Sequence, residues 1–168
     1  MGNFFAHPPG NSGGLSREAA ATCFTQLGAL INEFEALVED THFVLVPGPT
    51  DPGPAPGLIP RPPLARCFTA DLREDAPNIH LGTNPCRLHF CGQQLVFFRE
   101  DLMHKMRRNL VVHADVEPPE LCHHHHLAKA ILDQATLCPL PATTRPVHWM
   151  ADHGAQHAWH GKPIGKLV

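Results

Sequence analysis

The sequence of 168 residues has no long apolar run and no strong excess of charge of either sign. No apolar stretch approaches the roughly 20 residues that a membrane-spanning helix needs, so we expect no membrane partner. The net charge is −3 and only 17% of the residues are charged, which leaves no overall basic field to attract nucleic acid. The length suits one domain with a hydrophobic core.

The sequence also has no CxxC pair among its six cysteines. Such pairs are typical of redox motifs and of many zinc sites. Without them, we interpret the cysteines mostly as reduced residues of the core. They are Cys23, Cys67, Cys86, Cys91, Cys122 and Cys138.

Proline is abundant, with 18 residues, and eight of these lie between positions 47 and 63. Fixed φ angles and missing N–H groups make this segment a stiff loop and exclude it from the centre of a sheet. Its PxxP-like spacing would suit an SH3-type groove. Because apolar Leu58 and Ile59 lie within it, we favour a loop packed on its own domain.

Apolar periodicity predicts an amphipathic helix over 16–40, with Ser16 as its N-cap. Its core-facing stripe comprises Ala20, Phe24, Leu27, Ile31, Phe34 and Val38. A short apolar run predicts a buried strand over 42–46.

Further patterns predict a helix over 64–75, a strand over 78–84 and a hairpin over 86–100 that turns near Gly92-Gln93. A helix over 100–111 has acidic residues first and basic residues last, and a helix over 124–137 is stopped by Pro139. A final strand is expected over 145–150. Helices and strands alternate and a hairpin is added, which indicates an α/β domain with mixed strand directions.

The segment FVLVPGPTDPG, 43–53, delivers a loop from a strand end, where α/β proteins often hold their chemistry. Its G-P-T-D, 48–51, resembles the G-N-H-[DE] loop of binuclear metallophosphoesterases. Pro49 stands at the Asn position and has no side-chain oxygen, and Thr50 stands at the His position. Asp51 remains.

A second segment, G-N-F-F-A at 2–6, resembles the G-D-x-x-D motif of the same enzymes. Asn3 and Ala6 stand at its two aspartate positions, and a neutral amide cannot replace a carboxylate that bridges two divalent ions. We therefore predict no catalytic residue, no metal and no cofactor.

An ordered set of segments is similar to the B-subunit family of DNA polymerases alpha, delta and epsilon. The segments are MGNF, FVLVPGPTDPGP, LIPRPPLA, NPCRLHFCGQQLVFFREDLMHKMRRN, ILDQATLCPLP and RPVHW. The resemblance covers about residues 1–153, and VPGPTDPG and FREDLMHKMRRN favour the epsilon branch.

This resemblance implies a calcineurin-like metallophosphoesterase fold, with mixed β-sheets flanked by helices, that has lost its catalytic residues. It implies a non-catalytic accessory subunit of the polymerase epsilon complex, acting in nuclear DNA replication. The expected partners are the C-terminal zinc-binding region of the catalytic subunit, other replication-fork subunits, and DNA as part of the complex.

The sequence departs from the family pattern in three places. The pattern has further sequence before the glycine turn and after RPVHW, so we expect a fold that is incomplete at both ends. The partial inactive domain would span 1–153, and 154–168 would be a divergent tail that is disordered or mispredicted. Thr136 stands where the family has a histidine. Missing strands would expose sheet edges, so we expect the chain alone to be poorly soluble or partly folded.

Two alternatives stay open. An active metal-dependent phosphodiesterase could use non-standard ligands, such as Asp51 with the histidines of CHHHH, 122–126; five or more ligands would then have to converge on two ions. A zinc-binding module could instead be built on Cys122, the histidines and Cys138.

The remaining polar candidates are weaker. Lys105, Arg107 and Arg108 could contact phosphate or an acidic partner, or form a solvated helix end that the helix dipole favours. The scattered histidines are interpreted as ordinary strand or loop residues; they are His42, His80, His89, His113 and His148.

Overall fold

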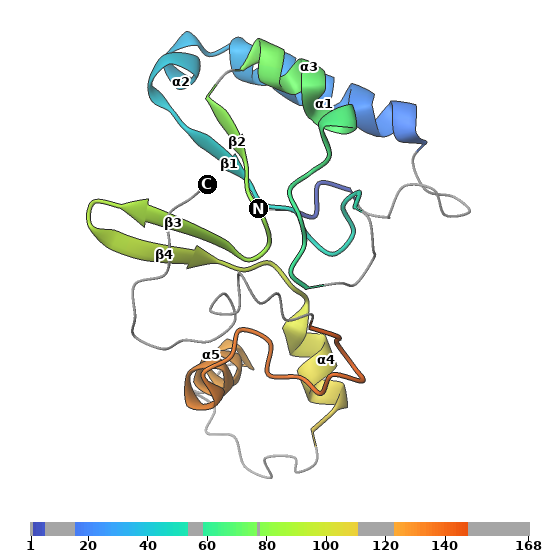
Figure 1. Ribbon diagram of the computed structural model, residues 1–168, viewed down its shortest axis with the longest axis vertical. Coiled ribbons are helices and arrows are strands. Elements are labelled where there is room, and N and C mark those ends of the chain that lie inside the picture. Colours follow the sequence, from blue (N-terminus) through green and yellow to red (C-terminus); the bar gives the residue numbers. More distant parts are fainter. Residues whose placement is uncertain (1, 6–15, 54–58, 77, 111–122, 148–168) are drawn as a thin grey trace.

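The computed structural model describes residues 2–5, 16–53, 59–76, 78–110 and 123–147 (Figure 1). Its helices are α1 (Arg17–Asn32), α2 (Glu35–Asp40), α3 (Arg66–Asp75), α4 (Leu102–Arg108) and α5 (His123–Gln134). Its strands are β1 (Phe43–Leu45), β2 (Ile79–Leu81), β3 (Cys86–Phe90) and β4 (Gln93–Phe97). β1 and β2 pair in parallel, and β3 and β4 form an antiparallel hairpin. The predicted α/β class with mixed strand directions is confirmed. None of the helices in these ranges has the length and apolarity needed to cross a membrane.

The larger hydrophobic core lies between the α1–α3 pair and the β1–β2 sheet (Figure 1). Ser16 caps α1 as predicted, because its hydroxyl accepts the Ala19 N–H at 3.1 Å. Phe24 is central: the Phe4 and Phe5 rings meet it edge-on, with centroids 5.7 and 5.4 Å away. The residues after the N-terminus are thereby held against α1.

The single helix predicted over 16–40 is wrong, because the helix breaks after Asn32. The Phe34 N–H donates to the Ile31 carbonyl, a tighter turn than the α-helical one. This break turns Phe34 off the core stripe, and 54% of Phe34 is exposed. Val38 in α2 still packs against the core, which explains why the periodicity runs on across the break.

The two strands of the parallel pair, β1 and β2, are shorter than predicted. β1 is half-buried rather than buried, although Val46 directly after it is buried. The Gly82 N–H donates to the Leu45 carbonyl at 2.9 Å, and the Val46 carbonyl accepts from Gly2 at 2.7 Å. Up to Leu45 the backbone of β1 is thus bonded to the segment of β2. From Val46 on it is bonded to residue 2 near the N-terminus, and β1 ends there.

The predicted hairpin is confirmed, with its turn one residue earlier than predicted. Cys91 and Gly92 form the turn with φ of 49° and 78°, whereas Gln93 already lies in β4. Two successive positive φ angles are typical of the type I′ turn, which matches the twist of a hairpin.

Helix α4 begins at Leu102, so the predicted acidic first turn is wrong. Glu100 and Asp101 precede the helix, and their carboxylates bind Lys105 within α4 and Arg99 just before it. The basic last turn is confirmed, and it contains Lys105, Arg107 and Arg108.

Helix α5 ends at Gln134, before the predicted stop at Pro139. Ala135 has a φ of 50°, and the N–H groups of Ala135 and Thr136 donate to Leu132 and Ile131. This is a Schellman-type ending, built here without glycine. The strand predicted over 145–150 is reduced to a bridge between Val147 and Ile59, and 148–150 lie outside the described residues.

A second core joins α4 to α5 and to the segment after α5. Ile59, Leu102 and Cys138 are its buried centre. Cys86 is buried as well, as predicted. The prediction is wrong for Cys23, Cys67 and Cys91, which lie on the solvent sides of α1 and α3 and at the hairpin turn and are exposed; Cys122 lies outside the described residues.

Candidate functional site

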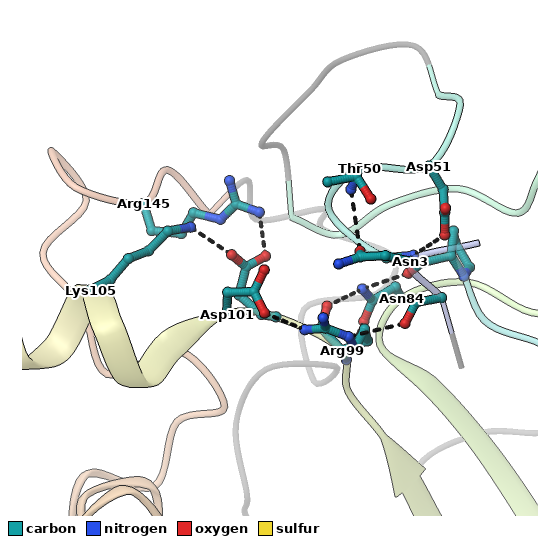
Figure 2. Close-up of polar contacts among 12 residues, drawn as sticks. Asn3, Thr50, Asp51, Asn84, Arg99, Asp101, Lys105 and Arg145 are labelled. Atoms are coloured by element: carbon teal, nitrogen blue, oxygen red, sulfur yellow. Dashed lines mark hydrogen bonds and ion pairs between the residues drawn. The ribbon is translucent and has the colours of Figure 1, made fainter. Parts of the chain in front are cut away.

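Two glycine turns, residues 2–5 and 48–51, lie against each other beyond the end of β1. The Thr50 hydroxyl donates to the Phe5 carbonyl at 2.5 Å, and the Thr50 N–H to Asn3 Oδ1 at 3.4 Å (Figure 2). A Cβ on Gly2 would collide with the Asp51 carboxylate, and one on Gly48 with the Asn3 amide. Glycine at both positions allows this close approach.

Asp51 is the buried acceptor at the centre of the glycine turns, with 3% of its surface exposed. Its Oδ1 accepts the Phe4 N–H at 2.6 Å and the Phe5 N–H at 3.2 Å. Its Oδ2 accepts the Gly48 N–H at 2.7 Å. Both carboxylate oxygens are therefore bonded to backbone donors, and the acid ties the two turns together.

Arg61 holds the second turn from the other side. Its Nη1 donates to the Pro49 carbonyl at 2.8 Å and its Nη2 to the Asp51 carbonyl at 2.6 Å. Burial lowers the pKa of the Arg61 guanidinium, and the nearby Asp51 carboxylate opposes that change. The buried guanidinium thus holds this turn through two backbone carbonyls, one of them that of Asp51.

Asn84 and Arg99 join the glycine turns to the hairpin, and sequence reasoning missed both residues. The Asn84 amide donates to the carbonyls of Pro47 and Arg99, at 2.8 and 2.7 Å, and accepts the Arg99 N–H at 3.1 Å. Arg99 Nε donates to the Gly2 carbonyl at 3.0 Å (Figure 2). The Asn-Pro dipeptide at 84–85 signals a turn, but nothing local in it indicates these partners.

A buried ion cluster lies next to this network, and it too was missed. The Glu100 side chain is 1% exposed and binds Lys105 Nζ at 2.6 Å and the guanidinium of Arg145 (Figure 2). Arg145 is itself buried. The cluster fixes the start of α4 to the segment after α5.

The three basic residues predicted to contact phosphate or an acidic partner differ in how available their charges are. The Lys105 ammonium is engaged by Glu100, so it is not a freely exposed charge. Arg107 and Arg108 are exposed at the end of α4. The last two alone offer guanidinium groups to an outside ligand in this helix turn.

The remaining predicted site residues are Ala6, Pro49 and Thr136. Ala6 is outside the described residues, and Pro49 contributes its carbonyl to Arg61. Thr136 follows α5, and its hydroxyl accepts the Cys138 N–H at 3.4 Å. The structure thus brings together Asn3, Thr50 and Asp51 from the predicted set.

For metal binding, the described ranges contain no group of three or more His, Cys, Asp or Glu side chains that could hold an ion. Cys122 and the His123 side chain lie outside what the structure describes, and Cys138 is part of the second core. Within those ranges, neither the phosphodiesterase alternative nor the zinc-module alternative has a ligand set. The geometry of the glycine turns serves to join segments.

Comparison with known proteins gives the family. A family model for the DNA polymerase alpha/epsilon B-subunit matches residues 1–156. The chain is 38% identical over 154 residues to DNA polymerase epsilon subunit 2 of Mus musculus, covering 90% of this chain and 28% of the relative. It is 39% identical over 153 residues to the DNA polymerase epsilon B-subunit of Arabidopsis thaliana, covering 91% of this chain and 28% of the relative.

More distant relatives agree. The DNA polymerase epsilon B-subunit of Saccharomyces cerevisiae is 27% identical over 167 residues, covering 77% of this chain and 24% of the relative. The chain spans about 28% of the length of the first two relatives. The match over 1–156 shows that the chain belongs to the DNA polymerase alpha/epsilon B-subunit family.

Proposed function

We propose that this chain acts as part of a non-catalytic accessory subunit of DNA polymerase epsilon in nuclear DNA replication. Its task would be assembly: it docks on the C-terminal zinc-binding region of the catalytic subunit and helps hold further replication-fork subunits. Its fold would be a calcineurin-like phosphoesterase domain without the metal chemistry. The partial domain would span 1–153, with 154–168 as a divergent tail.

The family match over residues 1–156 is the observation that carries this proposal. The hydrogen bonds of Asp51 support the part of the proposal that the chain is not catalytic. Both oxygens of that carboxylate accept backbone N–H groups, from Phe4, Phe5 and Gly48. Three of its roughly four lone-pair positions are thereby used, which leaves little capacity to bridge two ions. Asn3 and Thr50 contribute an amide and a hydroxyl beside it, and both are weak ligands for a bridging divalent ion.

Co-purification tests the assembly role. The chain is expressed with the C-terminal region of the epsilon catalytic subunit, and complex formation is measured by size-exclusion chromatography with light scattering. We expect a stoichiometric complex that is lost when the zinc-binding cysteines of the partner are replaced by serine. Failure to bind the intact partner region would contradict the proposal.

A hydrolysis assay tests the phosphodiesterase alternative on the same sample. Bis-p-nitrophenyl phosphate is incubated with the chain and Mn²⁺ or Mg²⁺, and product is measured against buffer with the same ion. We expect no protein-dependent hydrolysis. Turnover that follows the protein peak through purification would favour the enzyme instead.

DNA contact within the complex is proposed for Arg107 and Arg108, whose side chains are exposed at the basic end of α4. Each phosphate contact releases counterions, so DNA affinity falls as salt rises. Replacing either Arg by Ala is expected to make the negative slope of log binding constant against log salt concentration shallower by about 0.9. Arg66→Ala on α3 removes an exposed arginine of another helix and serves as the matched control. Equal slopes for all three variants would contradict this contact.

A further inference from the structure

His42 and His80 lie together on the exposed side of the β1–β2 sheet. His42 precedes β1 by one residue, and His80 is the middle residue of β2, paired in register with Val44. Because side chains alternate along a strand, His42, Val44 and His80 share one face. The opposite face carries Phe43, Leu45 and Ile79 into the larger core.

The two imidazoles approach each other closely through their nitrogens. His42 Nδ1 is 3.1 Å from His80 Nε2, the ring centroids are 5.3 Å apart, and the ring planes meet at 40°. At this distance one ring donates its N–H to the ring nitrogen of the other. Both rings are exposed, so this hydrogen bond competes with water and contributes little to folding.

The same spacing fits a shared metal ion. Two nitrogens bound to Zn²⁺ at about 2.05 Å with a tetrahedral angle lie about 3.3 Å apart. The 3.1 Å between the two nitrogens is therefore close to the spacing of a chelating pair. On binding, each ring would turn so that its lone pair points at the ion and not at the other nitrogen. Imidazole suits divalent zinc, nickel and copper.

We propose that His42 and His80 form a two-histidine surface site for a divalent transition metal ion of the zinc and nickel type. The remaining coordination positions belong to water, since no third His, Cys, Asp or Glu joins the pair within the described ranges. The bound ion links the segment before β1 to β2. These parallel strands have three residues each, so the ion fastens a short pairing.

The test removes a competing source of imidazole first. His124 and His125 are exposed on α5, and they are replaced by glutamine together with His123 and His126 of the same tract to give the background chain. Zn²⁺ and Ni²⁺ are titrated into it by calorimetry. His42→Gln, His80→Gln and the double variant are then measured, and His104→Gln on α4 is the matched exposed control.

We expect each single variant to lose one bound ion per chain at micromolar metal, or to bind it at least tenfold more weakly. Because a chelate needs both rings, the double variant should lose no more than either single variant. His104→Gln should bind like the background. Unchanged binding in both single variants, or losses that add in the double variant, would overturn the proposal.

A second measurement locates the ion. Diethyl pyrocarbonate modification followed by mass spectrometry reports the reactivity of each histidine. Zn²⁺ should protect His42 and His80 together and leave His104 reactive. Circular dichroism without metal checks that the variants fold, and equal reactivity of His42 and His80 with and without Zn²⁺ would again overturn the site.

Discussion

At the residue scale, the hydrogen bonds of Asp51 show that this buried carboxylate has a structural role. In a metal site its oxygens would point at ions, whereas here they accept three backbone N–H groups from two segments of the chain. Hydrogen bonds to a charged acceptor are stronger than neutral ones. The residue is thus placed to stabilise the contact between the glycine turns.

Asp51→Asn is expected to destabilise the chain by about 2–3 kcal/mol, as measured by urea unfolding. The amide keeps one acceptor oxygen, so it can serve one turn, but its NH₂ group then faces an N–H of the other turn. Asp101→Asn is the matched control. Asp101 binds Arg99 in an exposed ion pair, so its loss should cost less than about 1 kcal/mol. Equal effects of the two substitutions would contradict this role for Asp51.

The cysteines give a second prediction at the residue scale. Burial raises the pKa of the Cys86 thiol, and burial with the nearby Glu100 carboxylate raises that of Cys138. A raised pKa lowers the thiolate fraction at pH 7.5, and the thiolate is the reactive form.

Iodoacetamide followed by peptide mass spectrometry should therefore modify the exposed Cys23, Cys67 and Cys91 at least about tenfold faster than Cys86 and Cys138. In urea the five rates should converge. Fast modification of Cys138 in the native chain would mean that the second core opens readily.

At the element scale, the break between α1 and α2 decides which aromatic residues matter. Phe24 is 2% exposed among the rings of Phe4 and Phe5, whereas Phe34 follows the break and faces solvent. Sequence periodicity assigns both residues to one core stripe. The structure distinguishes them.

Phe24→Ala is expected to cost about 3–5 kcal/mol, because it removes a buried ring and leaves a cavity. Phe34→Ala should stay within about 0.5 kcal/mol, as for an ordinary surface position. Both are measured by urea unfolding monitored by circular dichroism. If the two substitutions cost the same, the helix continues through Glu33 and the break is absent in solution.

The same contrast shows what the sequence can predict. Local patterns predicted the Ser16 cap, the α3 helix and the β3–β4 hairpin, because each depends on neighbours within a few residues. They failed where the position of a side chain depends on a partner far away in the sequence. Glu100 looks like the first acid of a helix, yet its carboxylate binds Arg145, 45 residues away.

The candidate site follows the same rule. Two glycine-containing segments could be recognised individually, and family resemblance supplied a reason to compare them. That Asp51 of one segment would bind the amides of the other, 46 and 47 residues away, is a tertiary fact. Asn84 and Arg99 escaped prediction for this reason too.

At the scale of the whole molecule, the hairpin presents an apolar surface. Phe90 is 68% exposed and Leu95 is exposed beside it, on the face that also carries Leu88. Within the described residues, β3 and β4 pair only with each other, so each has one unpaired edge. Exposed apolar faces and free strand edges favour association.

The chain alone is therefore expected to self-associate with rising concentration, as measured by sedimentation velocity. Phe90→Lys with Leu95→Lys should shift the distribution toward monomer, since charge on an edge strand opposes pairing. The matched control is Leu30→Lys with Leu132→Lys, which places two charges at exposed positions on α1 and α5 and should leave association unchanged.

Comparing the two pairs of substitutions distinguishes association through the hairpin from nonspecific hydrophobic association. Association that both pairs of substitutions reduce equally would assign it to exposed apolar area as a whole. A native chain that stays monomeric and melts sharply would contradict the prediction altogether. If the hairpin pair alone restores the monomer, the apolar face of β3–β4 is the first surface to test for contact with the proposed partner, the polymerase catalytic subunit.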